Sequence, residues 1–90
     1  MSHPGRITVE FFGVPRLRAG CTEVSLIAET VGDALKEIAA KYPGLGDIMR
    51  NGRLAPSYLL SINGRRFDAA LRTKLAPSDR LLLLSADAGG

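Results

Sequence analysis

The sequence predicts a small α+β domain in which a mixed sheet of four to five strands packs on one main helix. The chain has 90 residues, enough for one domain, and 46% of them are hydrophobic, as in a globular chain. Segments with strand-like patterns flank a single stretch with helical periodicity, in the order β-β-α-β-β-β. Because a sheet must bury one of its faces, the apolar stripe of the helix is expected to cover it.

Two strands are expected before the helix. Residues 6–13 place Ile7, Val9 and Phe11 on one face and polar residues with Phe12 on the other. A Gly-Val-Pro sequence interrupts this pattern, residues 16–20 are expected to connect, and residues 23–27 alternate again. The two strands therefore form an antiparallel hairpin with a fairly long loop.

The helix is expected to begin after Thr30, a good N-cap, with Asp33 as an acidic partner in the first turn. Gly32 weakens this turn by roughly 1 kcal/mol relative to alanine. Pro43 and Gly44 end the helix. Its apolar residues recur at helical spacing and form one stripe: Val31, Ala34, Leu35, Ile38, Ala39 and Tyr42.

The second half of the chain predicts three more strands. A short extra turn at 45–49 and a loop at Asn51-Gly52 precede a strand at 58–62, and Asn63-Gly64 favours a type I′ hairpin turn. A return strand begins at residue 65, residues 71–75 are ambiguous, and residues 76–79 form a turn. The leucines at 81–84 predict a strand buried on both faces, hence in the middle of the sheet. If it lies beside the first strand, that pair can be parallel, because a helix intervenes.

Composition limits the classes of partner. The net charge is +3, with nine arginines and three lysines. These cations indicate a solvated surface or a docking patch for an acidic protein. Nucleic acid is unlikely as a partner, because nine acidic residues are interspersed and only five aromatic residues could stack on bases. No apolar run approaches the roughly 20 residues of a membrane helix, and a single cysteine fits the cytoplasm.

The sequence shows no arrangement of residues that is typical of a catalytic site. His3 is the only histidine, so neither serine nor cysteine has an evident general base. Cys21 has no base and no clear positive helix end beside it that would make a reactive thiol, and we expect a structural or incidental role. No cysteine–histidine spacing indicates zinc, and no glycine-rich loop indicates a phosphate site. The sequence therefore predicts a protein that is not an enzyme.

The chain ends in two glycines, Gly89 and Gly90. Two terminal glycines arise by chance in roughly 0.5% of chains at average glycine usage. We expect residues 1–84 to form the domain and residues 85–90 to form a flexible tail, which reaches roughly 20 Å when extended. Because glycine has no Cβ, such a tail can enter a narrow channel of another protein.

Four segments resemble one known family. Residues 7–13 (ITVEFFG) are similar to its opening strand, residues 29–35 (ETVGDAL) to its helix start, residues 61–64 (SING) to its third-strand hairpin, and residues 75–81 (LAPSDRL) to the turn before its last strand. Their order, spacing and Gly-Gly end identify the chain as similar to the ThiS/MoaD family of ubiquitin-like sulfur-carrier proteins. It resembles the branch of the molybdopterin-synthase small subunit more than the thiamin branch. The resemblance implies the β-grasp, or ubiquitin-like, fold.

The resemblance also implies a chemistry. A ubiquitin-activating-like adenylyltransferase would use ATP to adenylate the Gly90 carboxylate, and a sulfur donor would displace AMP to give a thiocarboxylate. Gly89 would provide access to the partner's active site. A sulfur-accepting synthase, in molybdopterin, thiamin or another biosynthesis, would then take the sulfur. The carrier itself would bind no cofactor stably. Two alternatives are a ubiquitin-like modifier that forms isopeptide bonds through Gly90 and an interaction module with an idle tail.

Partner docking is expected on the sheet face that the helix leaves open. Either phase of each strand could face the helix, and the candidate apolar residues are Phe12, Leu59 and Leu83. The alternative is that loops or the short turn at 45–49 cover this face. Arg65 and Arg66 are candidates for framing this patch and pairing with acidic residues of a partner.

Overall fold

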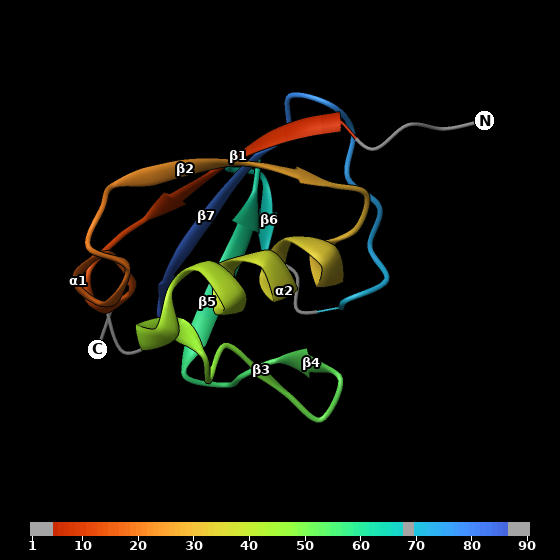
Figure 1. The fold of residues 1–90 in the computed structure, drawn as a ribbon. Helices are drawn as coiled ribbons and strands as arrows, with labels where there is room; N and C mark the ends of the chain where they lie inside the picture. The colour runs from red at the N-terminus through yellow and green to blue at the C-terminus, as the bar shows by residue number, and fades with distance from the viewer. Residues whose placement is uncertain (1–4, 68–69, 87–90) are drawn as a thin grey trace.

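The computed structural model describes residues 5–67 and 70–86 and confirms the β-grasp fold. One main helix, α2, packs against one face of a mixed sheet (Figure 1). The elements in chain order are β1 (Gly5–Phe11), α1 (Val14–Ala19), β2 (Glu23–Ala28), α2 (Val31–Lys41), the 3-10 turn η1 (Pro43–Leu45), β3 (Met49–Arg50), β4 (Arg53–Leu54), β5 (Tyr58–Ile62), β6 (Arg66–Phe67) and β7 (Arg80–Ser85).

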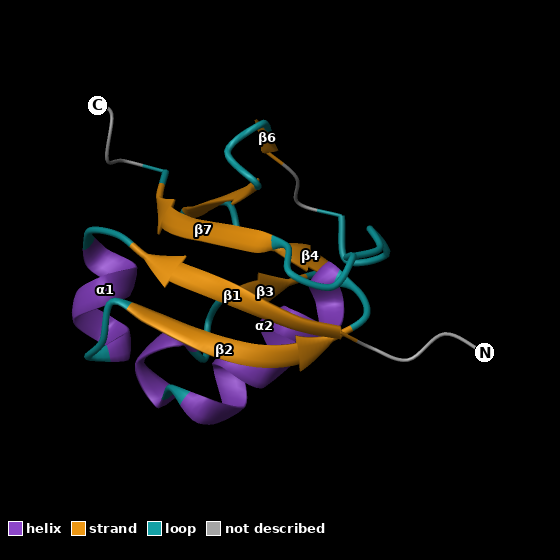
Figure 2. Ribbon diagram, turned by 90° about the horizontal axis from the view of Figure 1, so that it is seen from above, coloured by secondary structure: helices purple, strands orange, loops and turns teal. Residues whose placement is uncertain are grey.

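The last strand lies in the centre of the main sheet. The strand order is β2-β1-β7-β5-β6, with β7 parallel to β1 and antiparallel to β5. Figure 2 shows β7 and β1 side by side, with the helices behind the sheet. The predicted central position of the final strand and its parallel pairing with the first strand are both confirmed.

The core lies between the sheet and α2. Ile7, Val9 and Phe11 of β1 point into it, as do Leu81 and Leu83 of β7. From the helix side it receives Val31, Ala34, Leu35 and Ile38, joined by Leu45 and Ile48 after the helix. This burial on one sheet face leaves the other face open to solvent.

Two predictions for β7 are wrong. Leu82 and Leu84 are partly exposed, so the strand is not covered on both faces. The side chain of Leu83, a candidate docking residue, is fully buried in the core, with 0% of its surface exposed. Its phase is the one that faces α2, and β7 also continues one residue past the predicted end, to Ser85.

A short helix, α1, occupies the segment that the sequence predicted to be a simple connection. Pro15 lies in its first turn and is buried, and Gly20 ends it in the left-handed conformation with φ 77°. A Cβ on Gly44 would lie 2.7 Å from the Arg18 carbonyl oxygen, so glycine is required where η1 meets α1. Six residues are too few to show a helical stripe in the sequence.

The start of α2 is held in two ways. The Thr30 hydroxyl accepts a hydrogen bond from the Asp33 amide at 3.1 Å, which confirms the predicted N-cap. The Gly32 amide donates to the Leu71 carbonyl at 2.9 Å, and a Cβ on Gly32 would lie 3.0 Å from that oxygen. Gly32 therefore allows residues 71–75, whose secondary structure the sequence left ambiguous, to lie against the helix. There Lys74 forms an isolated antiparallel β-bridge with Thr30.

Two turns share one conformation. Asn63 and Gly64 have φ values of 54° and 67°, as expected of a type I′ turn between β5 and β6. Asn51 and Gly52 have 53° and 72°. The second pair closes the β3–β4 hairpin, where the sequence had indicated only a loop.

The leucines of β7 that face the core are expected to contribute more to stability than those that face the open side of the sheet. We expect Leu83→Ala to lower the free energy of unfolding by about 2–5 kcal/mol, because it leaves a cavity in the core. Leu84→Ala removes the same atoms from a partly exposed position and should cost clearly less. Urea denaturation of both variants measures the difference, and equal costs would contradict the assignment of faces.

Candidate functional site

The base of the tail lies where β7 leaves the sheet beside β5. Tyr58 is the register partner of Ser85, and the Ala86 amide donates to the Ser57 carbonyl at 2.8 Å. The chain is thus held by backbone pairing up to the last residue that the structure describes. The predicted reactive residue Gly90 and its neighbour Gly89 lie outside the described residues.

An apolar row crosses the open sheet face next to the tail base. Leu59 is the register partner of Leu84, and Phe11 pairs with Leu83 in the parallel ladder, so the following residues Phe12 and Leu84 are turned to the open face. Phe12 is 53% exposed and Leu59 37%. We call Phe12, Leu84 and Leu59 the outer apolar row. Two of the three predicted apolar residues, Phe12 and Leu59, belong to it, and Leu84 takes the place of the buried Leu83.

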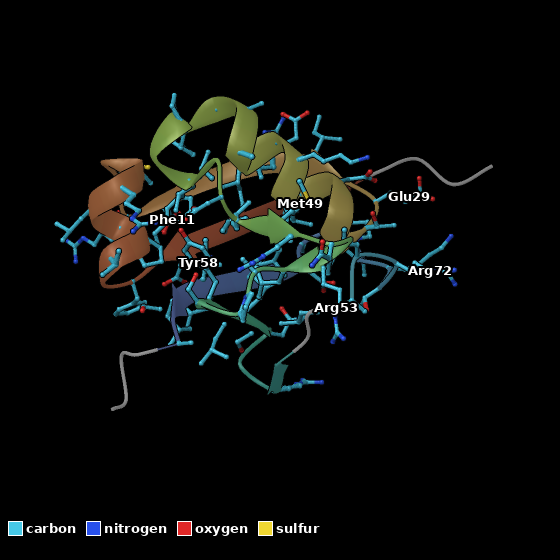
Figure 3. All side chains as sticks on the ribbon, turned by 90° about the horizontal axis from the view of Figure 1, so that it is seen from below. Phe11, Glu29, Met49, Arg53, Tyr58 and Arg72 are labelled. Carbon is cyan, nitrogen blue, oxygen red and sulfur yellow. The ribbon has the colours of Figure 1, made fainter. Side chains whose placement is uncertain are left out.

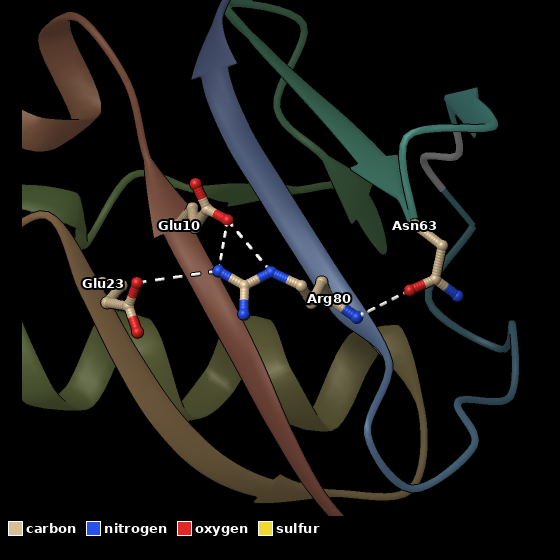
Figure 4. A network of polar contacts seen from close by, with 4 residues as sticks. All are labelled: Glu10, Glu23, Asn63 and Arg80. Carbon is tan, nitrogen blue, oxygen red and sulfur yellow. Dashed lines mark hydrogen bonds and ion pairs between the residues drawn. The ribbon is translucent and has the colours of Figure 1, made fainter.

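The opposite part of the same face is charged. Arg80 Nε donates to Glu10 Oε1 at 3.0 Å, a second nitrogen of its guanidinium contacts the same oxygen, and Glu23 lies 3.6 Å away (Figure 4). The Asn63 side-chain oxygen accepts from the Arg80 amide at 2.8 Å. The hydrogen bond and charge of Glu10 raise the pKa of Arg80. These ion pairs link β7, β1 and β2 across the open face.

A polar network lies beneath the tail base. Arg18 Nη1 donates to the Tyr58 hydroxyl at 2.7 Å, and that hydroxyl donates to Asp47 Oδ1 at 2.6 Å. Arg18 also pairs with Asp47 at 3.3 Å. Tyr58 projects from β5 on the side of the sheet seen in Figure 3. The network joins α1 to β5, and Val14, Arg18, Ser57, Tyr58 and Ser85 line a shallow hollow there.

This network shifts two pKa values. The hydrogen bond from Tyr58, helped by the charge of Arg18, lowers the pKa of Asp47 against the opposing effect of partial burial. Burial, followed by the hydrogen bond to Asp47, raises the pKa of Tyr58. Sequence reasoning missed Arg18 and Tyr58, because they are 40 residues apart and no local pattern joins them.

The two basic candidates do not join the outer apolar row. Arg65 is exposed in the turn after Ile62, whose register partner is Leu81, at the far end of β5 from Leu59. Arg66 lies in β6, and its side chain is outside the described part of the chain. The structure therefore brings Arg65 near the charged part of the face.

Cys21 has structural contacts. Its thiol lies 3.5 Å from the Tyr42 hydroxyl, and Tyr42 packs edge-on against Phe11 with ring centroids 5.5 Å apart. Burial and the neighbouring thiol raise the pKa of Tyr42 to about 12. His3 lies outside the described residues. Within residues 5–67 and 70–86, no three His, Cys, Asp or Glu side chains gather as a metal site would require.

Solved structures resemble this chain over its whole length, although no family model and no curated protein matches it. The small archaeal modifier protein 1 of Methanosarcina acetivorans is 30% identical, with a TM-score of 0.81 over 99% of this chain and 100% of that one. Molybdopterin converting factor subunit 1 of Pyrococcus furiosus is 17% identical, with a TM-score of 0.76 over 90% of this chain and 97% of that one. CysO, solved in complex with BexX of Amycolatopsis orientalis, is 20% identical, with a TM-score of 0.78 over 93% and 99%. The chain belongs to the ThiS/MoaD family of ubiquitin-like sulfur-carrier proteins.

The segments that resemble other ThiS/MoaD proteins serve the fold. Residues 7–11 lie in β1, and residues 29–35 enclose the capped start of α2. Asp79, the acidic residue of the last motif, accepts hydrogen bonds from the Asn63 side chain at 2.9 Å and from the Ala76 amide at 2.8 Å. It thereby fixes the turn that directs β7 into the centre of this carrier's sheet.

Neither helix of this ThiS/MoaD protein, within the residues that the structure describes, has the length and apolar character needed to cross a bilayer.

The tail-base network makes a prediction about pH. A carboxyl whose folded pKa is lowered stabilises the fold above its unfolded pKa of about 3.8, and this contribution is lost as the pH falls through the folded value. Tyr58→Phe removes the largest cause of the shift. We therefore expect the pKa of Asp47 to rise in this variant, and stability to depend less on pH below about 4.

NMR titration of the Asp47 carboxyl measures this change directly. Tyr42→Phe is the matched control, since it removes the other tyrosine hydroxyl, whose described partner is Cys21. An unchanged Asp47 pKa in Tyr58→Phe would contradict the network.

Proposed function

We propose that this chain carries sulfur as a thiocarboxylate at Gly90. An oxygen of the Gly90 carboxylate attacks the α-phosphorus of ATP in a partner adenylyltransferase, and pyrophosphate leaves. A sulfur donor at the oxidation level of hydrosulfide then attacks the acyl carbon, and AMP leaves. In an accepting synthase, the thiocarboxylate sulfur attacks an electrophilic carbon of the substrate, and water then cleaves the bond between the sulfur and the acyl carbon, which regenerates the Gly90 carboxylate. The carrier thus serves as a co-substrate and needs no catalytic base of its own.

Membership of the ThiS/MoaD family is the observation that carries this proposal. The geometry of the tail base supports it. Because β7 is paired with β1 up to Leu83 and with β5 up to Ser85, the chain leaves the domain from a fixed point beside α1 and β5. When a partner binds the domain, the start of the tail therefore lies at a fixed position relative to the partner's active site. This reduces the conformational entropy lost when the tail enters that site.

The outer apolar row supports a docking role for the open face. It lies beside the tail base, is exposed, and has no cover from any described element. Exposed apolar side chains gathered in one place are typical of a protein interface. CysO has been solved in a complex with BexX, and we propose that this chain likewise docks on partner enzymes.

A mass measurement tests the sulfur chemistry. After incubation with an activating enzyme, ATP and a sulfur donor, the intact mass should rise by the difference between one sulfur and one oxygen atom. Deletion of Gly90 should abolish this rise, because it removes the acyl carbon that the proposal requires. An adduct that persists without Gly90 would refute the assignment of the site.

Protein modification through Gly90 is a second candidate, since a solved structure with 30% identity is a small archaeal modifier protein. It predicts lysine-linked conjugates in lysates, which immunoblotting against the chain would reveal. An interaction module with an idle tail predicts instead that removal of Gly89 and Gly90 leaves partner binding and phenotype unchanged.

The docking role can be tested by placing a negative charge at either of two exposed apolar positions, one inside the outer apolar row and one outside it. Phe12→Asp puts a charge into the outer apolar row and should raise the KM of the activating enzyme for the carrier about tenfold or more. Ile27→Asp is the control, because Ile27 is 56% exposed but lies on β2 beside Arg6, away from the row. Equal effects on adenylation, with both variants folded by circular dichroism, would exclude a docking site at Phe12.

A further inference from the structure

Two arginines face each other across the β3–β4 hairpin. Arg50 and Arg53 are register partners, and the type I′ conformation of Asn51 and Gly52 holds them opposite one another. Directly opposite residues of an antiparallel pair point to the same face, so the two guanidinium groups leave the hairpin on one side. Both residues are exposed, and Figure 3 shows Arg53 on the helix side of the molecule.

This pair does not help the hairpin to form. Like charges directly opposite each other in a sheet are destabilising. Among the described residues, no carboxylate pairs with Arg50 or Arg53. The acidic groups that do form ion pairs are engaged elsewhere: Asp47 with Arg18, Glu29 with Lys74, and Glu10 and Glu23 with Arg80. The described residues therefore give these two opposed charges no role in stabilising the ladder.

A hollow leads from this pair toward the tail base. It has a volume of about 520 Å³, and its lining includes Arg50, Arg53, Pro56, Tyr58 and Leu59. Leu59 belongs to the outer apolar row, and Tyr58 is the register partner of Ser85 at the end of β7. The hollow thus connects a concentrated positive charge with the apolar surface and the start of the tail.

We propose that the arginine pair receives carboxylates on the surface of the activating enzyme that adenylates Gly90; this rests on the proposed function. A guanidinium group binds a carboxylate through two parallel hydrogen bonds, and two adjacent guanidinium groups suit an acidic cluster. The pair would steer the encounter and fix the orientation of the carrier, while the outer apolar row supplies the contact area.

A protein fits this surface better than a nucleic acid does. Binding along a phosphate backbone needs a row of cations and, for single strands, aromatic platforms. The hairpin offers two cations beside an apolar hollow, and the net charge of the whole chain is only +3. Apolar contacts flanked by charge are the usual composition of a protein interface.

Charge reversal at one arginine separates folding from binding. In Arg50→Glu the new carboxylate faces Arg53, so a repulsive pair becomes an attractive one and the melting temperature should rise by about 1–5 °C. The same change removes the positive patch. Affinity for the activating enzyme, measured by calorimetry without ATP, should fall about tenfold or more, and its dependence on salt should weaken.

Arg6→Glu is the matched control. It makes the same change in net charge at an exposed position on β1, beside Ile27 and at the far end of that strand from Phe11. We expect it to leave the affinity within about twofold of the wild type, because it lies outside the proposed contact.

Calorimetry and ATP–pyrophosphate exchange together distinguish the outcomes. Loss of affinity in Arg50→Glu but not in Arg6→Glu supports the contact, even if no exchange occurs and the carrier function fails. Exchange with the wild type and unchanged affinity in Arg50→Glu overturns the contact and leaves the carrier function standing. An equal loss of affinity for the activating enzyme in both variants overturns the contact. The contact is also overturned if Arg50→Glu weakens binding to a single-stranded oligonucleotide but not to the activating enzyme.

Discussion

The pairing of β7 on both sides is the constraint on which the rest of the structure depends. Parallel pairing with β1 and antiparallel pairing with β5 put the last strand of the chain in the middle of the sheet. Its residues Leu81 and Leu83 then occupy the centre of the core. The same pairing fixes the point where the chain leaves the domain, because Ala86 is still hydrogen-bonded to Ser57. Stability of the domain and placement of the tail thus rest on one element.

The strand period turns this constraint into two different surfaces. Alternate residues of β7 must point to opposite faces, so a leucine run that fills the core also places Leu82 and Leu84 on the open face. Arg80, at the start of the strand, collects Glu10 and Glu23 around it, and Leu84, near its end, lies between Phe12 and Leu59. One strand therefore has a neutralised polar end and an apolar end, and the apolar end is the one from which the tail departs.

The sequence predicted the features that depend on local patterns. The helix cap at Thr30, the turn at Asn63-Gly64 and the central place of β7 follow from signals within a few residues or from the crossover rule. The faces of β7 could not be assigned, because four leucines in succession contain no polar residue to mark the solvent side, and the choice of Leu83 over Leu84 was therefore wrong. Helix α1 was too short for periodicity. The network of Arg18, Tyr58 and Asp47 joins residues that only the tertiary fold brings together.

The surfaces proposed for function share one physical property, which is that folding does not require them. A domain of 90 residues has a small core; exposed apolar groups add nothing to the stability that this core provides, and opposed like charges reduce it. The outer apolar row exposes Phe12 to water, and the β3–β4 hairpin holds Arg50 against Arg53 without a described carboxylate between them. The other opposed like charges of the described sheet are compensated: Glu10 and Glu23 are register partners, and Arg80 pairs with both of them. Because the arginine pair and Leu59 of the outer apolar row line the same hollow, the single partner proposed to bind the tail would contact both surfaces at once.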